Sequence, residues 1–192
     1  MSSHLTHSTG TLLPSTPHLT IGHPSPSTSY ADRFAFRLLL LHPTTPTLAL
    51  SSPWDTPPLH RLPGGFIPSL SNHSAATRHE LEWETGGRIA LLSGDAVGTT
   101  EEWQSVEGVG VRQITVAYVA VLVPLGECEG GEEDGVTDEM LERKLKLVWV
   151  GRGEAKGVIE GEEVRTEVGV GIRERDGFLL ERGLRVLQGE GL

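Results

Sequence analysis

Residues 64–87 read GGFIPSLSNHSAATRHELEWETGG, and this stretch decides how the rest of the chain is interpreted. Ser71 or Asn72 can cap the amino terminus of a helix, because either side chain can accept a hydrogen bond from a free backbone N–H group. The Gly-Gly pair at the end of the stretch supplies a stop, since glycine readily adopts the left-handed conformation that follows many helices. The stretch therefore predicts a helix over about 72–85.

Two carboxylates share one face of this predicted helix. Glu80 and Glu84 are four residues apart, a spacing that places side chains one above the other, with Trp83 beside them. Like charges at this spacing repel, whereas a divalent cation bound between them reverses the sign of the interaction. The spacing alone fits two structures, a solvated acidic helix face and a metal site.

The spacing of the stretch resembles the Nudix box, a run in fixed register that ends in Arg-Glu-apolar-X-Glu-Glu-X-Gly. The positions that match, without insertion or deletion, are Gly65, Glu80, Leu81, Glu84 and Gly86. The positions that differ are Ser71 in place of Glu, His79 in place of Arg, Trp83 in place of the first Glu of the pair, and Gly87 in place of an apolar residue. The chain thus keeps the family's spacing and changes part of its chemistry.

Apolar runs elsewhere in the chain predict strands and one further helix. The predicted strands cover 33–41, 47–51, 88–92, 113–123 and 145–150, with a short edge strand open at 19–21. The predicted helix, over 176–188, has an apolar stripe made by Leu179, Leu180, Leu184 and Leu187. Strands with few, separated helices indicate an α/β or α+β fold. The resemblance, which covers about 33–187, implies the Nudix-like form of it, a mixed β-sheet sandwiched between helices.

The resemblance also implies an activity and a metal. The activity is hydrolysis of a pyrophosphate bond in a nucleoside diphosphate linked to another moiety, with Mg²⁺ or Mn²⁺ as the cofactor. Glu84 is then the main metal ligand, Glu80 a second ligand that also orients the attacking water, and the backbone carbonyl of Gly64 a third.

A further acid is expected from a loop downstream of the box, as in the family. The segment 127–142 carries eight acidic residues and is placed to supply it, with Glu127 and Glu129 as the first candidates. Glu132 and Glu133 are further candidates from the same segment.

Aromatic and basic residues near the box are candidates for substrate contacts. Trp83 lies beside Glu80 and Glu84 on the helix face expected to bind the metal, and we expect its ring to line the cleft in which the substrate binds. Arg61 directly precedes the Leu-Pro-Gly-Gly turn, where it could contact a substrate phosphate or be an ordinary surface residue. Trp54 and Trp103 are expected in loops, where each ring could stack on a base or cap the edge of the core.

The changed box leaves a second class of function open. Trp83 replaces a carboxylate that helps to bind metal in the family, which favours weakened catalysis. The alternative is a catalytically inactive Nudix-like domain that binds a ligand or a protein partner, or performs non-hydrolytic chemistry in the same pocket.

Composition limits the partners and the location of the protein. The 192 residues carry a net charge of −10, which argues against a nucleic-acid polymer as the partner but not against a small nucleotide. The longest apolar run is too short to span a membrane. A single cysteine, Cys128, indicates a reducing compartment, and we expect a cytoplasmic protein.

The length favours one domain with an extension at its amino terminus. Residues 1–29 are rich in Ser, Thr, Pro and His and contain no Asp, Glu, Lys or Arg, so most of this segment is expected to be flexible. The Nudix-like domain is then expected over 30–192, and the sequence leaves its oligomeric state open.

Overall fold

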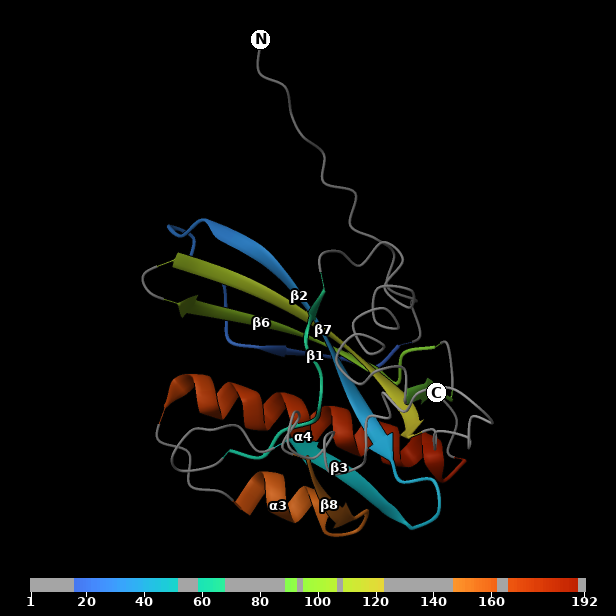
Figure 1. Cartoon of the computed structure of the whole chain (residues 1–192). Helices are drawn as coiled ribbons and strands as arrows, with labels where there is room; N and C mark the ends of the chain where they lie inside the picture. Colours follow the sequence, from blue (N-terminus) through green and yellow to red (C-terminus); the bar gives the residue numbers. More distant parts are fainter. Residues whose placement is uncertain are drawn as a thin grey trace, which may run out of the picture.

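The computed structural model describes residues 16–51, 59–67, 89–92, 95–106, 109–122, 147–161 and 166–189. Within these ranges the chain forms one mixed β-sheet with two helices packed on it (Figure 1). The mixed α/β class predicted from the sequence is therefore confirmed. Neither of the described helices is long and apolar enough to cross a membrane.

In the described part of the chain, the sheet has the strand order β1-β6-β7-β2-β3-β8, with β4 paired to β2 and β5 paired to β7. The strands are β1 (His18–Ile21), β2 (Tyr30–Leu41), β3 (Thr47–Ser51), β4 (Phe66–Ile67), β5 (Ile89–Leu91), β6 (Gly98–Val106), β7 (Val109–Leu122) and β8 (Leu147–Gly151).

Two long strands, β2 and β7, lie parallel at the centre of the sheet (Figure 1). Their apolar runs are almost continuous because both faces of these strands are buried. Alternate side chains point to opposite faces, so Leu39 and Val119 contribute to one core cluster while Leu38 and Tyr118 contribute to the other.

The strands predicted over 33–41, 47–51, 88–92, 113–123 and 145–150 are confirmed as β2, β3, β5, β7 and β8, with small shifts at their ends. No strand was predicted at β6, because Thr100 and Glu102 on this strand are buried polar residues and break the apolar alternation. The prediction that Trp103 lies in a loop was wrong, since Trp103 lies in β6 and pairs with Arg112 of β7.

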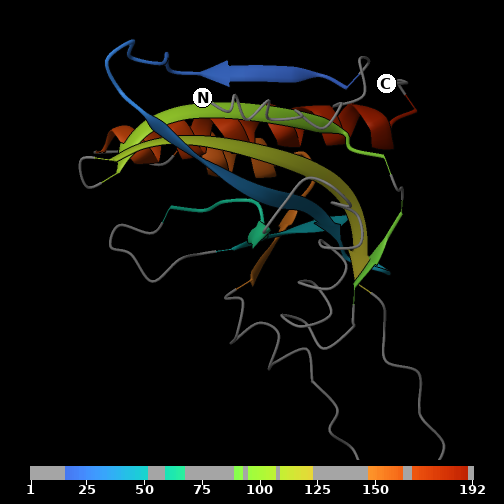
Figure 2. The same cartoon turned by 90° about the horizontal axis from the view of Figure 1, so that it is seen from above.

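The sequence left a short edge strand at 19–21 as a possibility, and the structure has this strand as β1. It runs parallel to β6 at one edge of the sheet (Figure 2). The backbone N–H of Thr99 donates to the Pro17 carbonyl at 2.9 Å just before the strand begins. The sheet thus starts inside the segment 1–29 that composition predicted to be mostly flexible. Composition gives little warning of such a strand, because its neighbour's backbone supplies the ladder hydrogen bonds that hold it.

The two described helices are α3 (Ala155–Gly161) and α4 (Glu167–Leu187). The long helix α4 begins at Glu167, before the start at residue 176 that the sequence indicated. Its N-cap is Thr166, whose hydroxyl accepts a hydrogen bond from Gly169 N at 3.1 Å. Glycines in the first half of α4 concealed this start, because glycine has a low intrinsic helix propensity.

Both α3 and α4 pack on the face of the sheet that carries Leu39 and Val119. The apolar stripe predicted on α4 is confirmed, and its members are Leu179, Leu180, Leu184 and Leu187. Gly183 permits the close approach of α4 to the sheet, because a Cβ atom there would lie 2.1 Å from Leu39 Cδ2. The helix predicted over 72–85, for the other layer, lies outside the described residues.

Candidate functional site

Of the residues predicted to form the site, the structure describes Arg61 and Gly64. The predicted residues outside the described ranges are Glu80, Trp83, Glu84, Glu127 and Glu129. Among the described side chains, no group of three or more His, Cys, Asp or Glu could hold a metal ion. A site for Mg²⁺ or Mn²⁺ at the box therefore stays a prediction.

The turn that leads into the box is bonded to the central strand β2. The N–H of Leu38 donates to the Pro63 carbonyl at 2.8 Å, and the N–H of Phe36 donates to the Gly65 carbonyl at 3.0 Å. These two bonds fix the backbone on either side of Gly64. The same backbone then continues into β4, which pairs with β2 at Phe66 and Ile67.

Position 64 in this turn requires glycine. Its φ is 156°, and a Cβ atom there would lie 2.2 Å from the Phe36 carbonyl oxygen. The backbone bonds between this turn and β2 use the carbonyls of Pro63 and Gly65, not that of Gly64. The Gly64 carbonyl oxygen, a hard neutral donor of the kind that Mg²⁺ and Mn²⁺ accept, thus fits the ligand role predicted for it.

Arg61 is held at the start of this turn by its backbone. Its N–H donates to the Ser51 carbonyl at 3.0 Å, and its carbonyl accepts from Ser51 N at 2.8 Å. The Arg61 side chain is half-buried, and its charge contributes to lowering the pKa of the neighbouring Arg37. Arg61 therefore belongs to an ordered basic region beside the turn.

Beneath the turn lies a buried ionic network that the sequence did not predict. It joins β2, β6 and α4 through side chains that are at most 6% exposed, namely Arg37, Glu102, Arg175 and Asp176. Arg175 is the centre of the network, because its Nε donates to Asp176 Oδ1 at 2.6 Å and its Nη1 donates to Glu102 Oε1 at 3.4 Å. The second carboxylate oxygen of Asp176 accepts a hydrogen bond from Leu62 N at 2.8 Å.

The two buried arginines have different electrostatic environments. Burial, reinforced by the charge of Arg175, lowers the pKa of Arg37 to about 9 against the opposing effect of Asp176. Burial also acts to lower the pKa of Arg175, but the carboxylates of Asp176 and Glu102 outweigh it and the pKa is raised. Arg175 is thus the paired cation and Arg37 the poorly paired one.

The geometry around Arg37 agrees with this difference. Its Nη1 donates to the Phe36 carbonyl at 2.8 Å, while its Nε lies 3.9 Å from Asp176 Oδ1 and makes no hydrogen bond within the described part of the chain. The signal for this network in the sequence was Arg37 itself, a charged residue inside the otherwise apolar run of β2. Such a residue requires a partner from another element, but the sequence does not say which one.

No protein-family model matches the chain, and no curated protein matches it. Among solved structures, the chain is similar to an Ap4A hydrolase from C. elegans, at 13% identity and a TM-score of 0.48, over 82% of this chain and 99% of that one. It is also similar to a MutT NUDIX hydrolase from Burkholderia pseudomallei, at 17% identity and a TM-score of 0.47, over 79% of this chain and 98% of that one.

A third similar structure is an ADP compounds hydrolase, at 14% identity and a TM-score of 0.45, over 84% of this chain and 76% of that one. Solved structures named as NUDIX hydrolases are thus among those that this chain is similar to. At these identities and TM-scores, the likeness assigns no activity to the chain.

Proposed function

We propose that the protein is a divalent-metal-dependent hydrolase of a pyrophosphate bond in a nucleoside diphosphate linked to another moiety. The single observation that carries this proposal is the turn at Gly64, which β2 holds on both sides, while the Gly64 carbonyl accepts no backbone hydrogen bond from a described residue. From the register of the sequence between Gly65 and Gly86, we expect Glu80 and Glu84 on a helix that follows β4.

In the proposed site, all ligands of Mg²⁺ or Mn²⁺ are oxygens, as these hard cations prefer. Glu84 is the main ligand, Glu80 and the Gly64 carbonyl are further ligands, and Glu127 or Glu129 completes the set. When bound, the metal polarises the phosphoryl oxygens of the substrate.

The protein's own residues supply the remaining chemistry. Glu80 orients the water that attacks phosphorus, and the guanidinium of Arg61 binds a phosphate of the substrate. Two observations favour this role for Arg61: its backbone is fixed to Ser51, and it directly precedes the turn. Trp83 lines the cleft beside the two carboxylates and contacts the substrate there.

A second candidate function follows from Trp83. This residue stands where the family has a metal-binding carboxylate, and Ser71 and His79 replace a further Glu and Arg of the box. In this alternative the domain has lost hydrolysis and binds a ligand or a protein partner, or performs non-hydrolytic chemistry in the same pocket. The two functions differ in whether the protein cleaves a diphosphate bond.

The experiment that separates the two functions measures phosphate and nucleotide release from a panel of diphosphate-linked nucleosides. The panel contains ADP-ribose, nucleotide sugars and dinucleoside polyphosphates, each with Mg²⁺ and with Mn²⁺. We expect turnover of at least one member, and a decrease of about 10²-fold or more for Glu84→Gln, the scale of losing a few kcal/mol of transition-state stabilisation.

The matched control is Glu82→Gln, which removes the same charge two residues away. Successive helical residues are about 100° apart, so residue 82 points away from the face shared by Glu80 and Glu84. We expect Glu82→Gln to retain turnover close to that of the parent protein. If folded protein cleaves no substrate and neither metal raises its melting temperature, the binding function replaces the hydrolase.

A further inference from the structure

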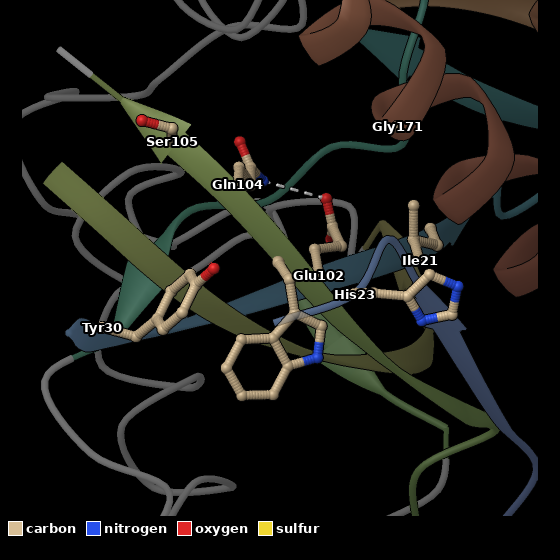
Figure 3. A pocket seen from close by; sticks show the side chains of 8 residues that line it. Ile21, His23, Tyr30, Glu102, Gln104, Ser105 and Gly171 are labelled. Atoms are coloured by element: carbon tan, nitrogen blue, oxygen red, sulfur yellow. Dashed lines mark hydrogen bonds between the residues drawn. The ribbon is translucent and has the colours of Figure 1, made fainter. Parts of the chain in front are cut away.

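A cavity of about 250 Å³ lies between the end of β1, the second half of β6 and the first half of α4 (Figure 3). It forms because β1 pairs with β6 only as far as Ile21, opposite Glu102, whereas β6 continues to Val106. The proposed hydrolase site uses none of the described residues that line this cavity.

Two aromatic rings form one corner of the cavity. Tyr30 and Trp103 lie edge to face, with ring centroids 4.9 Å apart and an angle of 86° between the planes. Tyr30 reaches Trp103 across β7 because position 110 is glycine; a Cβ atom at Gly110 would lie 2.9 Å from Tyr30 Cδ1. The guanidinium of Arg112 lies 5.4 Å from the centre of the Trp103 ring, so this indole already contacts one planar cation.

A buried carboxylate forms another wall. Glu102 is 2% exposed, and four donors lie within 3.4 Å of its Oε1, namely Arg175 Nη1 and the side chains of Thr100, Gln113 and Thr115. Its Oε2 accepts one hydrogen bond in the described part of the chain, from Gln104 Nε2 at 3.3 Å. Figure 3 shows Glu102 and Gln104 joined in this way beside the cavity.

The space in front of Oε2 is open because the facing residue of α4 is glycine. A Cβ atom at Gly171 would lie 4.0 Å from Glu102 Oε2, and it would meet no other described atom within 4 Å. A carboxylate oxygen has two lone pairs, so Oε2 can accept a second hydrogen bond from this side. The cavity therefore presents one acceptor oxygen of a carboxylate that is ion-paired with Arg175, next to two aromatic rings.

We propose that this cavity binds a small planar organic cation of the guanidinium or amidinium type. Such a group can donate one N–H to Glu102 Oε2, and its flat face packs against aromatic rings. Two of the lining side chains already contact a guanidinium, Trp103 that of Arg112 and Glu102 Oε1 that of Arg175. In the described part of the chain neither arginine donates to Glu102 Oε2, which is therefore the acceptor left for a ligand. The net charge of −10 also favours the approach of a cation.

The size of the cavity limits the ligand. Pockets for drug-sized molecules have volumes of roughly 300–1,000 Å³, so a cavity of about 250 Å³ fits a single ring or a short chain. This proposal does not depend on the hydrolase function, and each can fail without the other.

The test uses benzamidinium and benzamide as probes of the full chain. The two molecules have almost the same shape, but only benzamidinium is a cation with N–H donors on both nitrogens. Titration calorimetry at constant ionic strength gives the two dissociation constants. We expect saturable binding of benzamidinium, at least about tenfold tighter than that of benzamide. Absence of benzamidinium binding, or equal binding of the two probes, would overturn the proposal.

A pair of glycine variants locates the binding. Gly171→Ala places a methyl group in the space before Glu102 Oε2, and we expect it to weaken benzamidinium binding at least about tenfold. The matched control is Gly177→Ala on the same helix, whose new Cβ would meet only Glu160 Oε1, at 3.7 Å, among the described atoms.

Both variants replace a helical glycine by alanine, which favours the helix, so neither is expected to lower the melting temperature. We expect Gly177→Ala to bind benzamidinium as the parent protein does. If Gly171→Ala binds benzamidinium with unchanged affinity, the cation does not occupy this cavity and the proposal is wrong.

Discussion

Asp176, in the middle of α4, accepts a hydrogen bond from the backbone N–H of Leu62 at 2.8 Å, across 114 residues of sequence. The carboxylate is fully buried, and its other oxygen accepts from Arg175. One side chain therefore fixes both a buried arginine and the turn that carries Gly64. The geometry of the proposed metal site depends on this contact as well as on the box.

Replacing Asp176 by Asn tests this dependence. The carboxylate oxygens of Asp176 accept from two donors, Leu62 N and Arg175 Nε. The amide of Asn keeps only one acceptor oxygen and turns its NH₂ group toward the other donor, which therefore loses its hydrogen bond. Because breaking a buried ion pair leaves an uncompensated charge, we expect a loss of about 3–5 kcal/mol in the free energy of unfolding. Urea denaturation measures it, with the exposed Glu174→Gln as control, for which a change within about 0.5 kcal/mol is expected.

Gly64→Ala tests the turn itself. The new Cβ would lie 2.2 Å from the Phe36 carbonyl oxygen, so the backbone must move away from β2. We expect destabilisation of about 1–3 kcal/mol, together with weaker stabilisation by Mg²⁺, because the carbonyl proposed as a ligand is displaced. Thermal unfolding with and without metal measures both effects. Gly153→Ala is the control, since a Cβ there would have no described atom within 4 Å.

Replacing each of the two buried arginines by Met is expected to change the free energy of unfolding in a different direction. The pKa of Arg37 is lowered to about 9 in the folded protein, so its charged form opposes folding at every pH below about 9, and this cost is relieved as the pH rises from there toward the ordinary pKa of arginine in the unfolded chain. At pH 7 we expect Arg37→Met to leave the free energy of unfolding unchanged or to raise it by about 1–4 kcal/mol.

Arg175→Met is the counterpart, and the pKa of Arg175 is raised in the folded protein. Removing this cation leaves Asp176 and Glu102 buried without their main partner, so we expect a loss of about 3–5 kcal/mol in the free energy of unfolding. Denaturant titrations at pH 7 compare the two variants. Equal losses for both would contradict the assignment of Arg37 as the poorly paired cation.

Trp83→Glu tests whether the changed box is a weakened metal site. The substitution restores a carboxylate at the position where the family has one, and we expect tighter binding of Mg²⁺ in titration calorimetry. His79→Arg serves as a control, because it restores a family residue without adding a metal ligand. Unchanged or weaker metal affinity in a folded Trp83→Glu variant would show that the tryptophan did not displace a ligand.

The amino-acid sequence by itself determined the central strands and the apolar stripe of α4. The apolar runs of β2 and β7 and the repeat of leucines from Leu179 to Leu187 follow from burial alone, and burial leaves a periodic pattern in the sequence. The same kind of local reasoning identified the turn before the box, because consecutive glycines at 64 and 65 favour a turn over a helix or a strand.

Only the tertiary structure decided which distant polar residues meet. β6 could not be predicted, because its buried Glu102 has partners on β7 and α4 and its buried Thr100 donates to Glu102, and local sequence does not reveal the partners on other elements. The start of α4 at Glu167 depends on packing that outweighs the low helix propensity of its glycines. The hydrogen bond between Leu62 and Asp176 and the ring contact between Tyr30 and Trp103 likewise depend on tertiary packing. Hydrogen bonds and ring contacts between remote residues depend on how the elements pack, and not on any periodicity along the chain.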